Sequence, residues 1–169
     1  MDRLWAPWRS KYVTSAAKTA DPECIFCQKF NDNHEKDAEN LVLARTERCF
    51  VLMNLYPYNN GHLLVAPQRH VGDMTELAQD EMTELFEVTS WMLTVLRRAF
   101  NPDGFNVGIN VGRVAGAGIP GHFHIHIVPR WNGDTNFMPV LGDVKVISES
   151  LDDTYRKLKA AMEEVRSEA

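Results

Sequence analysis

The pattern of apolar and polar residues divides the chain into five short strand-like segments and one long helical segment. Apolar runs bounded by turn residues predict strands. These runs are residues 41–44, 49–53, 62–66, 105–111 and 122–128. Between the third and fourth runs the pattern changes to three- and four-residue steps, which predicts an amphipathic helix that ends near Phe100. The buried stripe expected for this helix is Leu85, Phe86, Thr89, Met92, Leu93 and Leu96.

The remaining segments complete the expected fold. Residues 23–30 are expected to form a short helix, residues 31–40 a polar loop, and residues 152–167, which are rich in helix formers, a C-terminal helix. The order of strands, long helix, strands and helix predicts an α+β domain with an antiparallel sheet. We expect residues 1–20 to form an N-terminal arm and residues 21–169 to form one domain.

Composition and charge narrow the class of protein. The chain has 169 residues, of which 44% are hydrophobic, which fits one folded domain and excludes a mostly disordered chain. A formal charge of −5 does not favour nonspecific binding to nucleic acid. No apolar run approaches the roughly 18 residues of a membrane span, and the first residues lack the pattern of a secretory signal. Three cysteines cannot form a closed disulfide framework, so we expect a cytoplasmic protein.

The most informative segment carries three alternating histidines, His122, His124 and His126. In a strand these side chains share one face, and the apolar residues between them share the other. The row has three interpretations: the solvated face of a half-buried strand, a set of metal ligands, or a catalytic group. A neutral imidazole is a nucleophile at pH 7, and neighbouring histidines can orient it or assist a leaving group.

A second motif is the Cys-x-x-Cys pair of Cys24 and Cys27. Such a pair indicates a metal site, a redox pair, or simply two buried small residues. The βαβ context of a thioredoxin-type site is missing, because the first clear strand begins later in the chain.

Residues 122–128 resemble the His-φ-His-φ-His-φ-φ signature of the histidine-triad (HIT) nucleotide-binding superfamily, where φ is an apolar residue. The resemblance extends over roughly residues 21 to 135. It implies an α+β fold whose five-stranded antiparallel sheet, with a long helix and a C-terminal helix, binds a nucleotide, usually as a homodimer. The other matching pieces are Phe50–Asn54, Gly61–Pro67, Asn110 and Pro129–Trp131.

The resemblance also implies roles for single residues. His124 would be the nucleophile that attacks the α-phosphorus and forms a nucleotidyl-histidine intermediate. His126 would contact phosphate and assist the leaving group, and His62 would support the nucleophile. Asn54 would bind the ribose and Asn110 the α-phosphate, although both residue types also cap turns and strand ends.

One position separates the branches of the family. Fragile-type hydrolases have a glutamine six residues before the nucleophile, where this chain has Gly118 in a loop that is one residue longer. This loop resembles that of bacterial dinucleoside tetraphosphate phosphorylases instead. Residues 3–9 and 54–59 also resemble those enzymes. We expect Gly118 to leave room for inorganic phosphate as the acceptor. Arg113 is then either a cation that holds this phosphate or a solvated loop residue.

In zinc-containing members of the superfamily, the two cysteines are joined by the histidine of a Pro-x-x-His piece and by the first histidine of the triad. Here the expected structural zinc ligands are Cys24, Cys27, His70 and His122. His34, seven residues after Cys27, is a rival for the fourth position.

These observations predict an enzyme that cleaves dinucleoside polyphosphates, with diadenosine tetraphosphate as the expected substrate and phosphate as the acceptor. Two alternatives remain at this point. The same histidine chemistry would serve a hydrolase of dinucleoside polyphosphates or nucleoside phosphoramidates that uses water. A different class is a zinc-stabilised nucleotide-binding module without catalytic activity.

Overall fold

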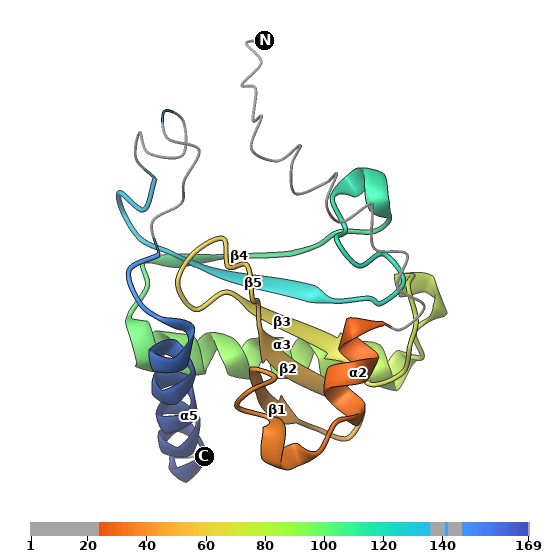
Figure 1. Ribbon diagram of the computed structural model, residues 1–169, viewed down its shortest axis with the longest axis horizontal. Helices are drawn as coiled ribbons and strands as arrows, with labels where there is room; N and C mark the ends of the chain where they lie inside the picture. The colour runs from red at the N-terminus through yellow and green to blue at the C-terminus, as the bar shows by residue number, and fades with distance from the viewer. Residues whose placement is uncertain (1–23, 136–140, 142–146, 169) are drawn as a thin grey trace.

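The computed structural model describes residues 24–135, 141 and 147–168, and within these it confirms the expected α+β fold (Figure 1). The expected N-terminal arm and residue Glu23 lie outside the described residues. The elements in chain order are α2 (Ile25–Asn31), η1 (His34–Lys36), β1 (Val42–Arg45), β2 (Cys49–Met53), β3 (Leu63–Pro67), η2 (Met74–Glu76), α3 (Gln79–Phe100), β4 (Gly104–Ile109), η3 (Arg113–Ala115), β5 (Ile125–Arg130) and α5 (Leu151–Ser167).

The strands form one sheet in the order β1-β2-β3-β5-β4, and every neighbouring pair is antiparallel. The strand that carries the histidine motif, β5, therefore lies between β3 and β4. His126 is opposite Leu64 on one side and Gly108 on the other. This register places the end of the triad inside the sheet, where its backbone is fixed by strand pairing on both edges.

Two hydrophobic cores cover the two faces of the sheet. Residues of α3 and α5 pack on one face together with Phe123, Ile125 and Ile127. Helix α2 packs on the other face, and in Figure 1 it lies in front of the strands while α3 passes behind them. The second core consists of Phe26, Val42, Phe50, Leu52, Leu64 and Ala66. Because both faces are covered, every residue of β2 and β3 is buried.

The long helix follows the expected stripe with one exception. Phe86 is 51% exposed, and Val88 occupies the buried face instead. The helix ends where expected, because Asn101 takes the left-handed conformation at φ 45° and its N–H bonds to the carbonyl of Arg97. The turn before β3 lies close to this end. Gly61 has φ 71°, and a Cβ atom there would meet the side chains of Leu96 and Phe100 at 3.2 Å.

The strand expected over residues 122–128 begins only at Ile125. The N–H of Phe123 bonds to the carbonyl of Val71, and that of His122 bonds to Ile119, so this segment pairs with loops rather than with a strand. Its side chains still alternate, because Phe123 enters the α3-side core. The expected loop over residues 31–40 contains the short helix η1. None of the helices in the described part of the chain is long and apolar enough to cross a membrane.

Candidate functional site

Three histidines predicted to act together lie side by side. His62 precedes β3, His126 is in β5, and the two rings are joined by a 3.0 Å contact between Nε2 of His62 and Nδ1 of His126. His124 is next to His126, with ring centroids 4.8 Å apart and an interplanar angle of 63°. The fold therefore gathers His62, His124 and His126 into one cluster on the face of the sheet opposite α3.

The backbone decides which nitrogen of His62 carries the proton. Nδ1 of His62 accepts the N–H of Tyr58 at 3.0 Å, and the amide nitrogen of Asn54 lies 3.3 Å from the same atom. An atom that receives a backbone N–H must have a lone pair, so neutral His62 carries its proton on Nε2. That N–H donates to Nδ1 of His126.

The same logic fixes His126. Because its Nδ1 accepts from His62, its own proton lies on Nε2. Nε2 of His126 is buried and has no hydrogen-bond partner among the residues that the structure describes. An unsatisfied buried donor costs about 1–3 kcal/mol. This N–H is therefore available to an acceptor that enters the site.

His124 has the complementary arrangement. Its Nδ1 donates to the backbone carbonyl of His122 at 2.8 Å, which leaves the lone pair on Nε2. Burial lowers the pKa of His124, although the bond to that carbonyl acts in the opposite direction. Burial and the neighbouring histidines also lower the pKa of His62 to about 3 and that of His126 to about 4. All three rings are therefore neutral at pH 7, and the lone pair of His124 is on Nε2.

Of the residues expected to bind the nucleotide, Asn54 contacts this cluster directly. Oδ1 of Asn54 accepts the N–H of Tyr56 at 3.0 Å, so this side chain caps its turn as well as contacting His62. Nδ2 of Asn110 lies 3.5 Å from the carbonyl oxygen of Gly116, which is part of the glycine-rich loop of residues 112–121. Gly118 is half-buried in the same loop. Their roles toward a nucleotide remain predictions.

Two aromatic residues at the cluster, Tyr58 and Phe26, are not among the site residues predicted from the sequence. The Tyr58 ring lies 4.6 Å from the ring of His62 and is stacked on His126 at 6.0 Å, while 46% of the residue is exposed. Phe26 contacts both His122 and His124. The available signals were modest: Tyr58 lies in a turn before a glycine-histidine pair, and Phe26 lies inside the Cys-x-x-Cys motif.

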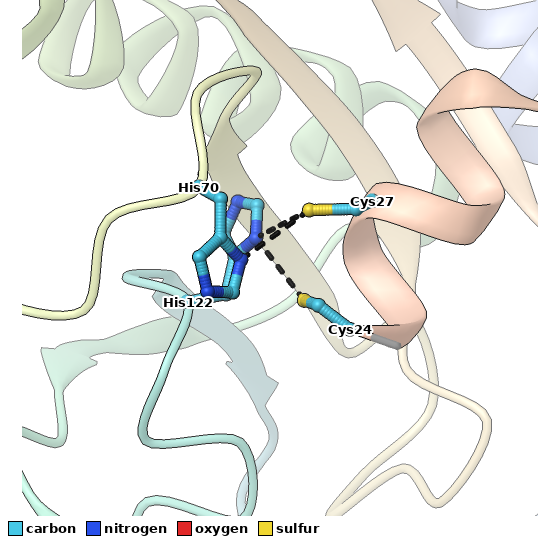
Figure 2. Close-up of side chains that lie close together, drawn as sticks. All are labelled: Cys24, Cys27, His70 and His122. Atoms are coloured by element: carbon cyan, nitrogen blue, oxygen red, sulfur yellow. Dashed lines mark hydrogen bonds between the residues drawn. The ribbon is translucent and has the colours of Figure 1, made fainter. Parts of the chain in front are cut away.

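The four residues expected to bind a metal come together at the start of α2 (Figure 2). Their ligand atoms all lie within 4.8 Å of one another, so Cys24, Cys27, His70 and His122 could hold a metal ion. Nδ1 of His122 is 3.3 Å from Sγ of Cys24 and 3.6 Å from Sγ of Cys27, and Nδ1 of His70 is 3.3 Å from Sγ of Cys27. His34 is not in the cluster.

Close packing of two loops brings the histidine ligands together. A Cβ atom on Gly72 would come within 2.8 Å of the carbonyl oxygen of Pro120, so only glycine fits this contact. The ring centroids of His70 and His122 are 5.3 Å apart as a result. Nε2 of His122 donates to the carbonyl of Pro67 at 2.8 Å, which directs the Nδ1 lone pair toward the cysteines.

The two cysteines lie on one side of α2, because Cys24 is its N-terminal cap and Cys27 follows three residues later. Burial and the adjacent Cys24 raise the pKa of Cys27 to about 11. Two thiolates in this position need a compensating positive charge, and a coordinated cation supplies one and deprotonates the thiols. Thiolate and imidazole ligands of this kind fit a zinc-like cation.

Comparison with known proteins places the chain in a family. The HIT domain matches residues 35–133. An AP-4-A phosphorylase of Mycobacterium tuberculosis strain H37Rv is 41% identical over 161 residues, which cover 94% of this chain and 83% of the relative. An asymmetrical bis(5'-nucleosyl)-tetraphosphatase of Schizosaccharomyces pombe is 38% identical over 93 residues, covering 55% of this chain and 50% of the relative.

A solved structure agrees with the sequence relatives. The crystal structure of a zinc-bound histidine triad family protein from Mycobacterium smegmatis matches with a TM-score of 0.71 and 26% identity, covering 88% of this chain and 99% of the other. The chain belongs to the HIT family. The family and the fold predicted from the triad segment are thereby confirmed.

Proposed function

We propose that this protein is an enzyme that cleaves diadenosine tetraphosphate through a nucleotidyl-histidine intermediate on His124. The observation that carries the proposal is the pair of complementary nitrogens in adjacent rings. His124 has a lone pair on Nε2, and His126 has an N–H on Nε2 that is unpaired within the described part of the chain. One is suited to attack phosphorus and the other to stabilise a phosphate oxygen.

In the proposed first step, Nε2 of His124 forms a bond to the α-phosphorus, and the bond to the bridging oxygen breaks. The electrons of that bond leave with ATP, and an adenylyl group stays on His124. The carbonyl of His122, which accepts from Nδ1, stabilises the positive charge that forms on the ring. Nε2–H of His126 donates a hydrogen bond to the departing phosphate chain, and His62 holds that ring in the required tautomer.

In the second step an acceptor attacks the adenylyl group and releases His124. Inorganic phosphate would give ADP, whereas water would give AMP. Gly118, without a side chain, leaves room for phosphate in the glycine-rich loop, and Asn54 and Asn110 would bind the ribose and the α-phosphate. The Mycobacterium tuberculosis relative, a phosphorylase by name, supports phosphate as the acceptor. The tetraphosphatase relative keeps hydrolysis as the second candidate.

Zinc is the metal that we propose for the Cys24, Cys27, His70 and His122 cluster. Bonds of about 2.3 Å to sulfur and about 2.0 Å to nitrogen at tetrahedral angles separate the two atoms by roughly 3.5 Å. The sulfur–nitrogen distances of 3.3, 3.3 and 3.6 Å agree with that spacing. A zinc ion held by four protein ligands has no open position, so its contribution would be structural.

We also propose that the enzyme is a homodimer. Strand β4 lies at the end of the sheet with one edge unpaired among the described residues, and its central residues 106–108 are exposed. An exposed edge strand is a surface on which a second copy could pair. The single domain of residues 21–169 would be the unit that associates.

The test of the proposed function is to trap the intermediate. Wild-type protein mixed with diadenosine tetraphosphate in phosphate-free buffer, quenched rapidly and measured by intact-protein mass spectrometry should gain one adenylyl group. His124→Ala should gain none and should lose turnover by about three orders of magnitude or more. His34→Ala, an exposed histidine outside the cluster, is the matched control and should behave as wild type.

Two results would contradict the proposal. A folded His124→Ala protein that keeps a tenth of the wild-type turnover would show that His124 is not the nucleophile. A wild-type protein that binds the nucleotide but neither forms the adduct nor turns over would instead support a binding module.

A further inference from the structure

Phe26 connects the metal ligands to the nucleophile. The ring centroid of Phe26 lies 5.0 Å from the ring of His122 and 5.0 Å from the ring of His124, with interplanar angles of 38° and 37°. Its residue is only 1% exposed. One aromatic side chain therefore packs against a metal-ligating histidine and the proposed nucleophile at once.

Phe26 is also located between the two cysteine ligands in sequence. Helix α2 has seven residues and no side-chain hydrogen bond at its N-terminal cap, so it is too short to be stable without tertiary contacts. A metal bound to Cys24 and Cys27 would fix the first turn of this helix to His70 and His122. The position of Phe26 against His124 would then depend on that metal.

The other end of α2 is held by a different set of contacts. The Arg45 guanidinium donates to the carbonyls of Lys29 and Phe30 and pairs with Asp37. The Phe30 ring packs on Phe50 with centroids 5.2 Å apart and under the Arg45 guanidinium at 5.1 Å. The first turn has one further contact, because Phe26 also packs against Phe50 in the second core. Removal of the metal would therefore loosen the first turn while the last turn stays in place.

We propose that Phe26 is a positioning residue for His124, through which occupation of the metal site fixes the orientation of the nucleophile. The hydrogen bond from Nδ1 to the carbonyl of His122 holds one edge of the His124 ring. The Phe26 ring packs against the His124 ring, restricts its rotation and so directs Nε2 of His124. A misplacement of about 1 Å in a reacting group can cost on the order of a hundredfold in rate.

This inference rests on the proposed function for its kinetic consequence but has a readout of its own. The direct measurement is the ¹⁵N spectrum of the histidine rings, with His124 assigned by its absence from His124→Gln. In metal-loaded wild type, His124 should show one tautomer with its proton on Nδ1. In Phe26→Leu with its metal retained, the two nitrogen signals should move toward averaged values because the ring is free to turn.

Phe30→Leu is the matched control. It makes the same substitution one turn further along α2, where the described ring contacts are to Phe50 and Arg45 rather than to a histidine. It should keep the wild-type tautomer signals. A chelator added to wild type should reproduce the averaged His124 signals of Phe26→Leu, and it should add little in the variant itself.

The kinetic part predicts where the loss appears. Formation of the adenylyl adduct in a single turnover should slow by about tenfold or more in Phe26→Leu, with KM changed by less than about twofold. Unchanged His124 signals in the metal-loaded variant, or in chelated wild type, would overturn the positioning role. A rise in KM alone would show instead that Phe26 contacts the substrate. Wild type without any adduct would defeat the proposed function, while the ring spectra would still decide the role of Phe26.

Discussion

At the scale of single residues, the site depends on which nitrogen of each histidine carries the proton. Main-chain groups settle this in three cases: the N–H of Tyr58 for His62, the carbonyl of His122 for His124, and the carbonyl of Pro67 for His122. A backbone partner cannot rotate away or change protonation. The arrangement of lone pairs and protons is therefore set by the protein before a nucleotide binds.

The buried histidines should make stability depend on pH. The pKa of His62 is about 3 in the folded protein, below its ordinary value of 6.5, because of burial and the adjacent His126 and His124. The unfolded chain binds more protons below pH 6.5, so the free energy of unfolding falls as the pH drops through this range. Between pH 7.5 and 5.5 this one group should account for on the order of 1 kcal/mol.

Urea unfolding of wild type and His62→Gln at the two pH values measures that contribution. The variant should lose less stability than wild type on going to pH 5.5. His34→Gln, at an exposed position on η1, is the control and should follow wild type. Equal pH dependence in wild type and His62→Gln would mean that His62 is not held in its neutral form by the fold.

The same residues show how far sequence reasoning reaches. The spacing of the triad and of the Cys-x-x-Cys pair identified five candidates, namely His122, His124, His126, Cys24 and Cys27. His62 and His70 followed only from the resemblance to the HIT superfamily. Neither the spacing nor the resemblance predicted a role for Tyr58, which acts on His62 through its backbone N–H. Every residue except proline has a backbone N–H, so the type of residue at this position carries no signal for this hydrogen bond.

At the scale of elements, α2 is the helix whose stability would depend most on the proposed zinc ion. Removing zinc with a chelator should lower the melting temperature by on the order of 10 °C, since the ion would stabilise the folded state by several kcal/mol. Protein purified without added metal should contain about one zinc per chain, and Cys27→Ser should contain much less. Elemental analysis and thermal melts measure both quantities.

His34→Ala is again the control, and it should keep both the zinc and the wild-type melting temperature. This comparison also separates the two candidates for the fourth ligand, because the cluster contains His70 and not His34. Zinc-free wild type with a melt that is insensitive to chelator would contradict the metal assignment.

Element boundaries were less predictable than element types. The long helix and all five strands follow from the apolar pattern, yet β5 begins at Ile125 rather than His122. The alternation of side chains extends beyond the paired backbone, and the pattern reports only the alternation. Phe86 was wrongly assigned to the buried stripe for a related reason. It is apolar and lies next to the stripe in sequence, but its residue is 51% exposed.

At the scale of the whole molecule, the sheet separates stability from chemistry. The α3 side holds the larger hydrophobic core, while the opposite face carries His62, His124, His126 and the helix with the cysteines. His126 lies in a central strand that is paired on both edges, and His62 and His124 immediately precede central strands β3 and β5. The glycine-rich loop between β4 and β5 contains Gly118, and this is where we propose that the acceptor is selected.

The products formed from diadenosine tetraphosphate show directly whether the enzyme is a phosphorylase that uses inorganic phosphate as the acceptor. Nucleotide chromatography after turnover with and without inorganic phosphate distinguishes the two acceptors, with His124→Ala as the inactive control. We expect ATP and ADP, with consumption that rises with phosphate concentration and with isotope from labelled phosphate found in ADP. Accumulation of ATP and AMP at millimolar phosphate, with no label in ADP, would contradict this expectation.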